Sequence, residues 1–148
     1  MIYFDSAYVA KFYLNEPGQA AVRSCAIDAG EVAICALALA EVNAVFHRKL
    51  REGFLTPDEV AIFHTEFDRD VQQGHWKLLP LTTDLLEQVA SAYRTLPATV
   101  FLRSADALHL ICAREHGFTE IHTNDRHVLI AAPHFGLIGV DVTSNTHP

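Results

Sequence analysis

Met1-Ile2-Tyr3-Phe4-Asp5-Ser6 opens the chain, and this stretch decides the fold. Its apolar and aromatic residues are typical of a short buried strand, while Ser6 is placed to cap a helix that continues to about residue 15. Asp5 stands at the junction between the two. An ionised carboxylate removed from water is costly unless it is paired or bound to a cation. A buried strand that ends in an acid and leads directly into a helix therefore predicts a functional group at the edge of a sheet.

The alternation of short strands and helices continues along the whole chain. Thr56-Pro57-Asp58-Glu59 and Ser104 are further signals for the N-terminus of a helix, and glycines end several helices. Such alternation predicts an α/β fold, a three-layer α/β/α sandwich around a mostly parallel central sheet of about five strands. We predict strands over residues 2–4, 31–35, 76–81, 118–122 and 137–142, and helices over residues 6–15, 19–29, 37–52, 57–73, 82–96 and 105–116.

The size and composition of the chain indicate one domain. Its 148 residues are 50% hydrophobic, which is enough for one core, and we place the domain at residues 1–142 and a frayed tail at residues 143–148. Every apolar run is shorter than the roughly 18 residues of a membrane-spanning helix, and no signal peptide is visible. We therefore expect a cytoplasmic protein that does not bind membranes. The odd number and wide spacing of Cys25, Cys35 and Cys112 predict reduced thiols.

Four acidic residues lie within apolar sequence. Asp5 ends the first strand, Glu41 follows Ala36-Leu37-Ala38-Leu39-Ala40, Asp106 precedes Ala107-Leu108, and Asp125 follows the strand that ends at residue 122. Because the carboxyl ends of parallel strands meet at one edge of a sheet, we expect the four carboxylates to gather there. Too few basic residues lie beside them to balance their charge. We therefore expect divalent cations, which prefer oxygen ligands, to bind among them.

Each of these acids also has an ordinary explanation. Asp5 can cap the helix that follows it, Asp106 can favour a helix dipole, and Asp125 can open an Asx-turn. The ordinary alternative for Glu41 is a buried ion pair with Arg48 or Arg103. The residues alone leave these alternatives open beside the shared site.

The formal net charge of −7 argues against a broad basic surface that grips nucleic acid. It does not exclude a nucleic-acid substrate, because bound metal ions would reverse the sign of the charge at the acidic cluster. The basic residues within one or two turns of a cluster acid are candidate phosphate contacts, although a solvated charge is the ordinary role for any one of them. They are Lys11, Arg48, Arg103 and Arg126.

The nine histidines do not follow a zinc-binding pattern, since the spacing of His122, His127 and His134 matches no common template and no cysteine accompanies them. His109 lies three residues after Asp106 on the same face of the predicted helix. It can therefore reach the acidic cluster, but we prefer a packing role for it.

Five short segments, spread over nearly the whole chain, carry a family likeness. They are Ile2-Tyr3-Phe4-Asp5-Ser6-Ala7, Leu14-Asn15-Glu16-Pro17-Gly18, Leu39-Ala40-Glu41-Val42, Ser104-Ala105-Asp106-Ala107-Leu108-His109-Leu110 and Thr123-Asn124-Asp125. In order and spacing they resemble the PIN-domain ribonucleases, and in particular the VapC-type toxins of prokaryotic toxin–antitoxin pairs. The resemblance implies a PIN-like fold and an endoribonuclease that hydrolyses RNA phosphodiester bonds with Mg²⁺ or Mn²⁺.

The resemblance also assigns roles to residues. It implies that the catalytic and metal-binding groups are Asp5, Glu41, Asp106 and Asp125, with Ser6 and Asn124 beside the metal. We add Arg103 and Arg126 as residues that support the site or contact substrate. The implied partners are RNA, a cognate antitoxin protein and a second copy of the chain in a homodimer.

The alternative function is a catalytically silent PIN-like module that binds RNA or protein. A haloacid-dehalogenase-type hydrolase is disfavoured, because its second aspartate is replaced here by Ala7.

Overall fold

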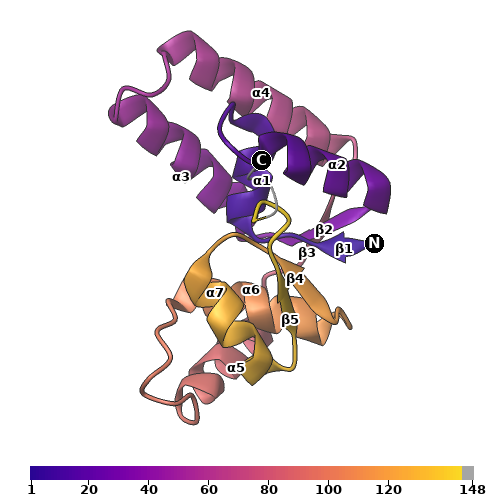
Figure 1. The fold of residues 1–148 in the computed structure, drawn as a ribbon, viewed down its shortest axis with the longest axis vertical. Helices are drawn as coiled ribbons and strands as arrows, with labels where there is room; N and C mark the ends of the chain where they lie inside the picture. The colour runs from indigo at the N-terminus through magenta and orange to yellow at the C-terminus, as the bar shows by residue number, and fades with distance from the viewer. Residues whose placement is uncertain (145–148) are drawn as a thin grey trace.

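The computed structural model describes residues 1–144 and is built around five short parallel strands (Figure 1). They form a three-stranded sheet in the order β1-β2-β3 and a two-stranded sheet of β4 and β5. A single parallel bridge between Phe4 and His122 joins the two sheets. The strands are β1 (Ile2–Tyr3), β2 (Val32–Cys35), β3 (Trp76–Leu79), β4 (Glu120–His122) and β5 (Ile138–Val140).

Helices cover the strands on two sides, which gives the three layers visible in Figure 1. On one side lie α1 (Ser6–Tyr13), α2 (Gln19–Ala29), α3 (Ala38–Arg51) and α4 (Pro57–Gln72). On the other side lie α5 (Thr83–Tyr93), α6 (Ser104–Glu115), α7 (Arg126–Ala131) and the 3₁₀ turn η1 (Ala132–Phe135). The predicted α/β class and its layered arrangement are confirmed. None of the helices within residues 1–144 is long and apolar enough to cross a membrane.

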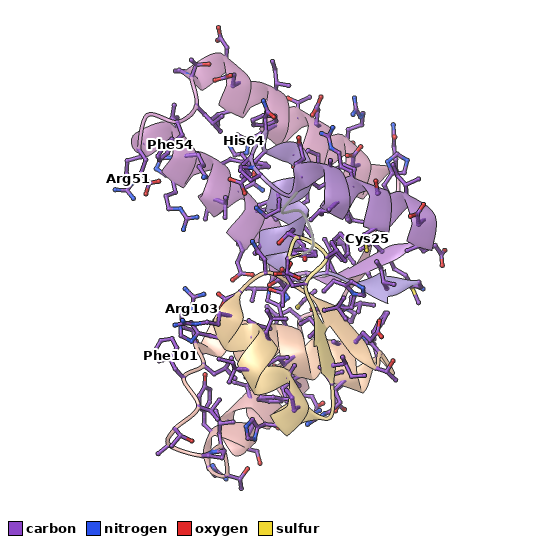
Figure 2. The ribbon with its side chains drawn as sticks, viewed as in Figure 1. Cys25, Arg51, Phe54, His64, Phe101 and Arg103 are labelled. Carbon is purple, nitrogen blue, oxygen red and sulfur yellow. The ribbon has the colours of Figure 1, made fainter. Side chains whose placement is uncertain are left out.

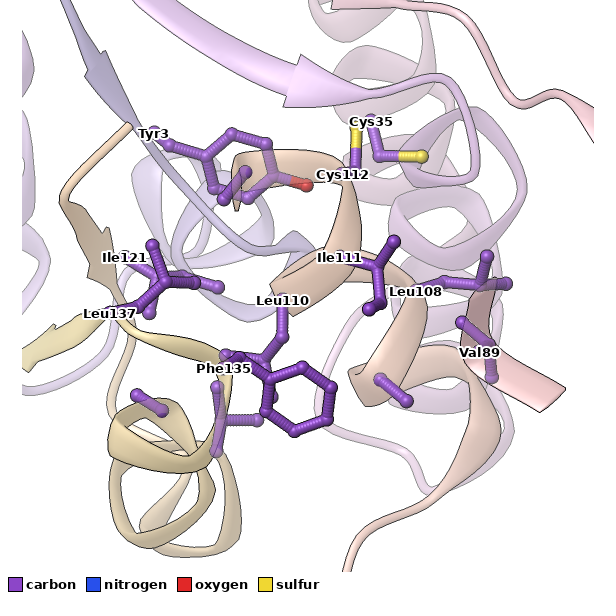
Figure 3. Close-up of a cluster of buried hydrophobic side chains, with 14 of the residues drawn as sticks. Tyr3, Cys35, Val89, Leu108, Leu110, Ile111, Cys112, Ile121, Phe135 and Leu137 are labelled. Atoms are coloured by element: carbon purple, nitrogen blue, oxygen red, sulfur yellow. The ribbon is translucent and has the colours of Figure 1, made fainter. Parts of the chain in front are cut away.

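The side-chain alternation of the strands produces two hydrophobic cores. All of β2 is buried, and its residues point alternately to opposite sides: Val32 and Ile34 pack against α1 to α4, whereas Ala33 and Cys35 pack against α5 to α7. Figure 3 shows the core on the side of α5 to α7, in which Phe135 packs among side chains of α6 and β4. A strand covered on both faces has to be apolar throughout, as the sequence of β2 is.

The sheet departs from the prediction in one respect. A single sheet of about five strands is wrong in detail, because the structure has separate sheets of three and two strands. The reason is the length of β1: only Ile2 and Tyr3 pair with β2 before the chain turns at Asp5 into α1. On the other edge of β1 the chain forms one bridge to β4, at Phe4.

Several helix boundaries match the sequence pattern. The helix over residues 19–29 is confirmed at both ends, and Thr56 and Glu59 form the capping box expected at the start of α4. Two predicted caps are wrong. Asp5 rather than Ser6 caps α1, and Ser104 is the first residue of α6 instead of its cap.

The prediction also missed α7. It has only six residues and leads directly into η1, which contains Pro133, so it is too short to show a helical period.

Four residues of the predicted tail, 145–148, lie outside the described part of the chain. Asp141 accepts hydrogen bonds at Oδ1 from the backbone N–H of Thr143 and at its carbonyl from the hydroxyl of Ser144.

Gly139 in β5 allows α7 to lie close to the strand. A Cβ atom at this position would meet the Leu129 side chain at 2.8 Å and the Leu129 Cα atom at 3.0 Å. The second distance is to backbone, so the contact cannot be relieved by a rotamer change. A residue with a side chain at this position would push apart β5 and the helix whose cap is Asp125.

We predict that Gly139→Ala lowers the free energy of unfolding by about 1–3 kcal/mol through overpacking. Ile138→Ala is the control, because Ile138 is 61% exposed and should change stability by much less. Urea denaturation followed by circular dichroism measures both. Equal stability of Gly139→Ala and the natural chain would contradict the close approach.

Candidate functional site

The four acids named from the sequence line one cavity of about 630 Å³. Asp5 follows β1, Glu41 lies in the first turn of α3, Asp106 lies in the first turn of α6, and Asp125 caps α7. The cavity opens at the carboxyl edge of the parallel strands, where ligands of open α/β sheets bind. Ser6, Arg48, Arg103 and His109 also line it.

Asp5 is the most buried of the four acids, with 5% of its surface exposed. Its Oδ1 accepts a hydrogen bond from the backbone N–H of Tyr8 at 2.9 Å, and its Oδ2 accepts one from the hydroxyl of Thr123. Burial raises the pKa of Asp5 to about 6, and the negative charge of Asp106 adds to this, against the lowering effects of His109 and of the two hydrogen bonds. The carboxylate is therefore held in a fixed orientation with much of its charge uncompensated.

Glu41 is held by two groups from different helices. Its Oε2 accepts a hydrogen bond from the Ser6 hydroxyl at 2.5 Å and lies 2.6 Å from Nε2 of His109. The Tyr3 hydroxyl contacts the other ring nitrogen of His109 at 3.0 Å and so fixes the ring. A packing role alone for His109 is wrong, because this buried imidazole contacts the acidic cluster directly.

The charges of this pair support each other. Burial acts to raise the pKa of Glu41, but the hydrogen bond and charge of His109 and the Ser6 hydroxyl outweigh it, so the pKa lies below its usual value. Burial acts to lower the pKa of His109, and the contact with Glu41 outweighs that and raises it. Glu41 therefore stays ionised opposite a histidine that favours its charged form.

Arg103 joins the other two acids. Its Nε donates to Oδ2 of Asp106 at 2.8 Å, and its Nη2 donates to Oδ2 of Asp125 at 3.0 Å. These hydrogen bonds and the two negative charges raise the pKa of the guanidinium, although burial opposes them. The expectation that too few basic residues lie beside the acids is therefore wrong for this pair. Figure 2 labels Arg103 at the edge of the layer that contains α6 and α7.

Thr123 is a site residue that the sequence reasoning missed. Its hydroxyl donates to Asp5 and accepts a hydrogen bond at 2.9 Å from the backbone N–H of Asp125. It thus links Asp5, which follows β1, to Asp125, which follows β4, by hydrogen bonds. Its position between the end of β4 and Asn124-Asp125 was the available signal, because short polar residues at strand ends form such local bonds.

The remaining candidates differ in their position relative to the cavity. Ser6 and Arg103 line the acidic cavity, Asn124 lines a neighbouring cavity of about 200 Å³, and Arg126 is exposed at the start of α7. Lys11 is buried and forms an ion pair with Glu16 at 2.8 Å, so its charge is used within the fold. All three cysteines are free thiols, as predicted, and Cys35 and Cys112 are buried.

The donors fit a hard divalent cation in kind, because all four are carboxylates and they face one cavity. Within residues 1–144, however, no three His, Cys, Asp or Glu side chains stand close enough together to form a ready-made metal site. Arg103 holds Asp106 and Asp125, while Ser6 and His109 hold Glu41. A cation that enters the cavity has to compete with these internal partners.

Asp5 should make the metal-free protein less stable at neutral pH. Its pKa is about 6 in the folded chain, above the ordinary 3.8, so the folded state holds the proton more tightly than the unfolded state does. Stability should therefore fall as the pH rises from about 4 to about 6 and stay lower above that.

We predict that Asp5→Asn removes this fall and raises the free energy of unfolding at pH 7.5 by roughly 1–3 kcal/mol. Denaturant titrations in EDTA between pH 4 and pH 8 measure it. Asp58→Asn, which removes an exposed carboxylate from α4, should leave the pH dependence unchanged. If the free energy of unfolding depends on pH in the same way in Asp5→Asn and in the natural chain, the Asp5 carboxylate does not destabilise the fold.

Comparison with known proteins agrees with the fold. The toxin VapC20 of Mycobacterium tuberculosis, which cleaves the sarcin–ricin loop, is 15% identical, with a TM-score of 0.67 over 88% of this chain and 95% of that one. FitAcB from Neisseria gonorrhoeae is 15% identical, with a TM-score of 0.69 over 96% and 98% of the two chains. A toxin–antitoxin complex from Klebsiella pneumoniae is 14% identical, with a TM-score of 0.63 over 96% and 98%.

At these identities the solved structures establish a shared fold. No curated protein matches the chain. The family model described as PIN domain matches residues 2–132, which include all four acids of the cavity. The chain therefore belongs to the PIN domain family.

Proposed function

We propose that this protein is a metal-dependent endoribonuclease, the toxin component of a toxin–antitoxin pair. The observation that carries the proposal is the convergence of four carboxylates, from separate elements of a PIN domain, on one cavity. Burial raises the pKa of Asp5 to about 6, so the charge of this carboxylate opposes folding at neutral pH. A group that costs stability and faces a cavity is typical of a functional site.

Asp5, Glu41, Asp106 and Asp125 are the proposed ligands of Mg²⁺ or Mn²⁺. When bound, such an ion stabilises the negative charge that develops on a phosphodiester during hydrolysis. The chain supplies the orientation: the Tyr8 N–H and the Thr123 hydroxyl hold Asp5, and Ser6 and His109 hold Glu41. Because these side chains are fixed before substrate binds, the site loses little energy to reorganisation.

Exposed basic residues at the rim are proposed to contact the phosphates of RNA. Arg48 lines the cavity from α3, and Arg103 and Arg126 lie on its other side. They provide local positive charge in a chain of net charge −7. The VapC20 toxin, which has the same fold, cleaves the sarcin–ricin loop, which supports RNA as the substrate class.

The proposed protein partners are an antitoxin and a second copy of the chain. Phe54, in the turn between α3 and α4, is 71% exposed, and Ile62 on α4 is 54% exposed. Such apolar side chains on a helical hairpin suit contact with an apolar helix or with another protomer. Solved relatives of the same fold occur in toxin–antitoxin complexes, which supports the antitoxin. The proposed location is the cytoplasm, where an RNA target and an antitoxin are available.

A catalytically silent PIN module that binds RNA or protein is the second candidate. The observation that favours it is Arg103, which already neutralises Asp106 and Asp125. Cleavage assays separate the two candidates.

We predict that the protein cleaves single-stranded RNA in Mg²⁺ or Mn²⁺ and not in excess EDTA. Asp5→Asn and Asp106→Asn should each lower the cleavage rate by about 100-fold or more, because each removes a charge that the site requires. Asp58→Asn is the matched control. Gel assays on several RNAs measure the rates. Intact RNA in every assay with added metal would favour the silent module.

We also predict that Arg103→Gln tightens Mn²⁺ binding by roughly 3- to 10-fold, because it frees two carboxylates and removes one positive charge from the cavity. Isothermal titration calorimetry measures the dissociation constant. Arg126→Gln removes the same charge from an exposed neighbouring position and should have a smaller effect. Weaker Mn²⁺ binding by Arg103→Gln would show that the arginine supports the metal instead of competing with it.

A further inference from the structure

Phe101 is an exposed aromatic residue on an otherwise anchored loop. It precedes α6, and 61% of its surface is exposed. Its neighbour Leu102 is buried in the core, and the Leu102 carbonyl accepts a hydrogen bond from the Tyr93 hydroxyl at 2.7 Å. Val100, on the other side, packs against the same core. The loop is therefore fixed on both sides of Phe101, and the ring projects from a rigid support.

The Phe101 ring lies against a histidine that belongs to the candidate site. The ring centroids of Phe101 and His127 are 4.6 Å apart, with an angle of 58° between the planes. The backbone N–H of His127 donates to Oδ1 of Asp125 at 2.7 Å, which places the His127 backbone beside one of the cavity acids. The aromatic pair is thus attached to the rim of the acidic cavity through His127.

The same loop carries the arginine of the site. Arg103 follows Phe101 by two residues, its side chain is 62% exposed, and it contacts Asp106 and Asp125. Figure 2 labels Phe101 and Arg103 on the same edge of the molecule, beside one another before α6. Arg126, which precedes His127, adds a second exposed cation. Phe101 and His127 are therefore in contact next to the cavity, and an arginine lies within two residues of each of them in the sequence.

This combination matches the chemistry that recognises an unpaired nucleotide. Unstacked bases are bound on aromatic and histidine rings, while neighbouring arginines contact the phosphates. A duplex does not offer a free base face, so such a surface selects single-stranded or looped RNA. The ring that contacts Phe101 is an imidazole and not another apolar side chain, which suits a base better than an apolar protein surface.

We propose that Phe101 and His127 form a stacking platform for one unpaired base of an RNA, adjacent to the phosphodiester held in the acidic cavity. The inference rests on the proposed ribonuclease function and adds to it the subsite that receives the base. Arg103 and Arg126 contact the phosphates on either side of that nucleotide. The platform thereby aligns the RNA strand with the four carboxylates.

Binding in EDTA tests the platform without cleavage. The probe is a single-stranded RNA oligonucleotide that carries 2-aminopurine at successive positions, since stacking quenches the fluorescence of this base. We expect quenching at one position, and we expect Phe101→Ala to abolish it and to raise the dissociation constant about 10-fold. Phe101→Trp should restore both. Ile27→Ala, which removes an exposed apolar side chain from α2 that does not line the cavity, is the control and should change neither.

A second measurement excludes a merely structural effect. An abasic nucleotide at the quenched position should weaken binding to the natural chain about as much as Phe101→Ala does, and should weaken binding to Phe101→Ala no further. Additive losses would overturn the platform, as would an RNA affinity unchanged by Phe101→Ala. If Phe101→Ala instead weakens only the binding of a co-purifying protein, the surface belongs to a protein partner and the inference is wrong.

The test distinguishes the two levels of the proposal. RNA that stacks on Phe101 but is not cleaved when Mg²⁺ is added would leave the platform in place and remove the nuclease function. RNA that is cleaved equally well by Phe101→Ala and by the natural chain, without quenching in either, would keep the nuclease function and remove the platform.

Discussion

The burial of a carboxylate at one edge of the sheet is the constraint on which the site depends. Asp5 is buried there with one neighbouring acid that raises its pKa further, and the fold offsets only part of this charge. His109 balances Glu41, and Arg103 balances Asp106 and Asp125. The core tolerates such a cluster because two apolar layers, one on each side of β2, provide the stability that the cavity removes.

The same acids serve the local backbone. Asp5 caps α1, and Asp125 caps α7, each through a hydrogen bond from a backbone N–H of the following helix. The ordinary explanations for these two residues are therefore correct and do not compete with a role in the cavity. Capping through Oδ1 fixes the χ angles of the Asp5 side chain. The other oxygen, Oδ2, is therefore held in place to accept the hydrogen bond of Thr123 and to face the cavity.

The sequence was sufficient for the parts of the fold that depend on local pattern. The strand and helix alternation, the capping box at Thr56 and the gathering of the four acids could be predicted from period, caps and parallel topology. The contacts of Arg103 with Asp125 and of His109 with Glu41 could not, because they join residues distant in the chain and depend on side-chain direction. The division of the sheet was equally hidden, since it follows from where β1 stops pairing.

The seam between the two sheets has a mechanical consequence for the cavity. One backbone bridge, from Phe4 to His122, and one hydrogen bond, from the Asp5 N–H to the His122 carbonyl, connect the strands there. Asp5 and Glu41 belong to one side of this seam, while Asp106 and Asp125 belong to the other. Side-chain hydrogen bonds cross the seam as well, because the Thr123 hydroxyl donates to Asp5 and His109 contacts Glu41. The spacing between the two carboxylate pairs is therefore set by one backbone bridge, a few side-chain hydrogen bonds and the hydrophobic core that both sheets share.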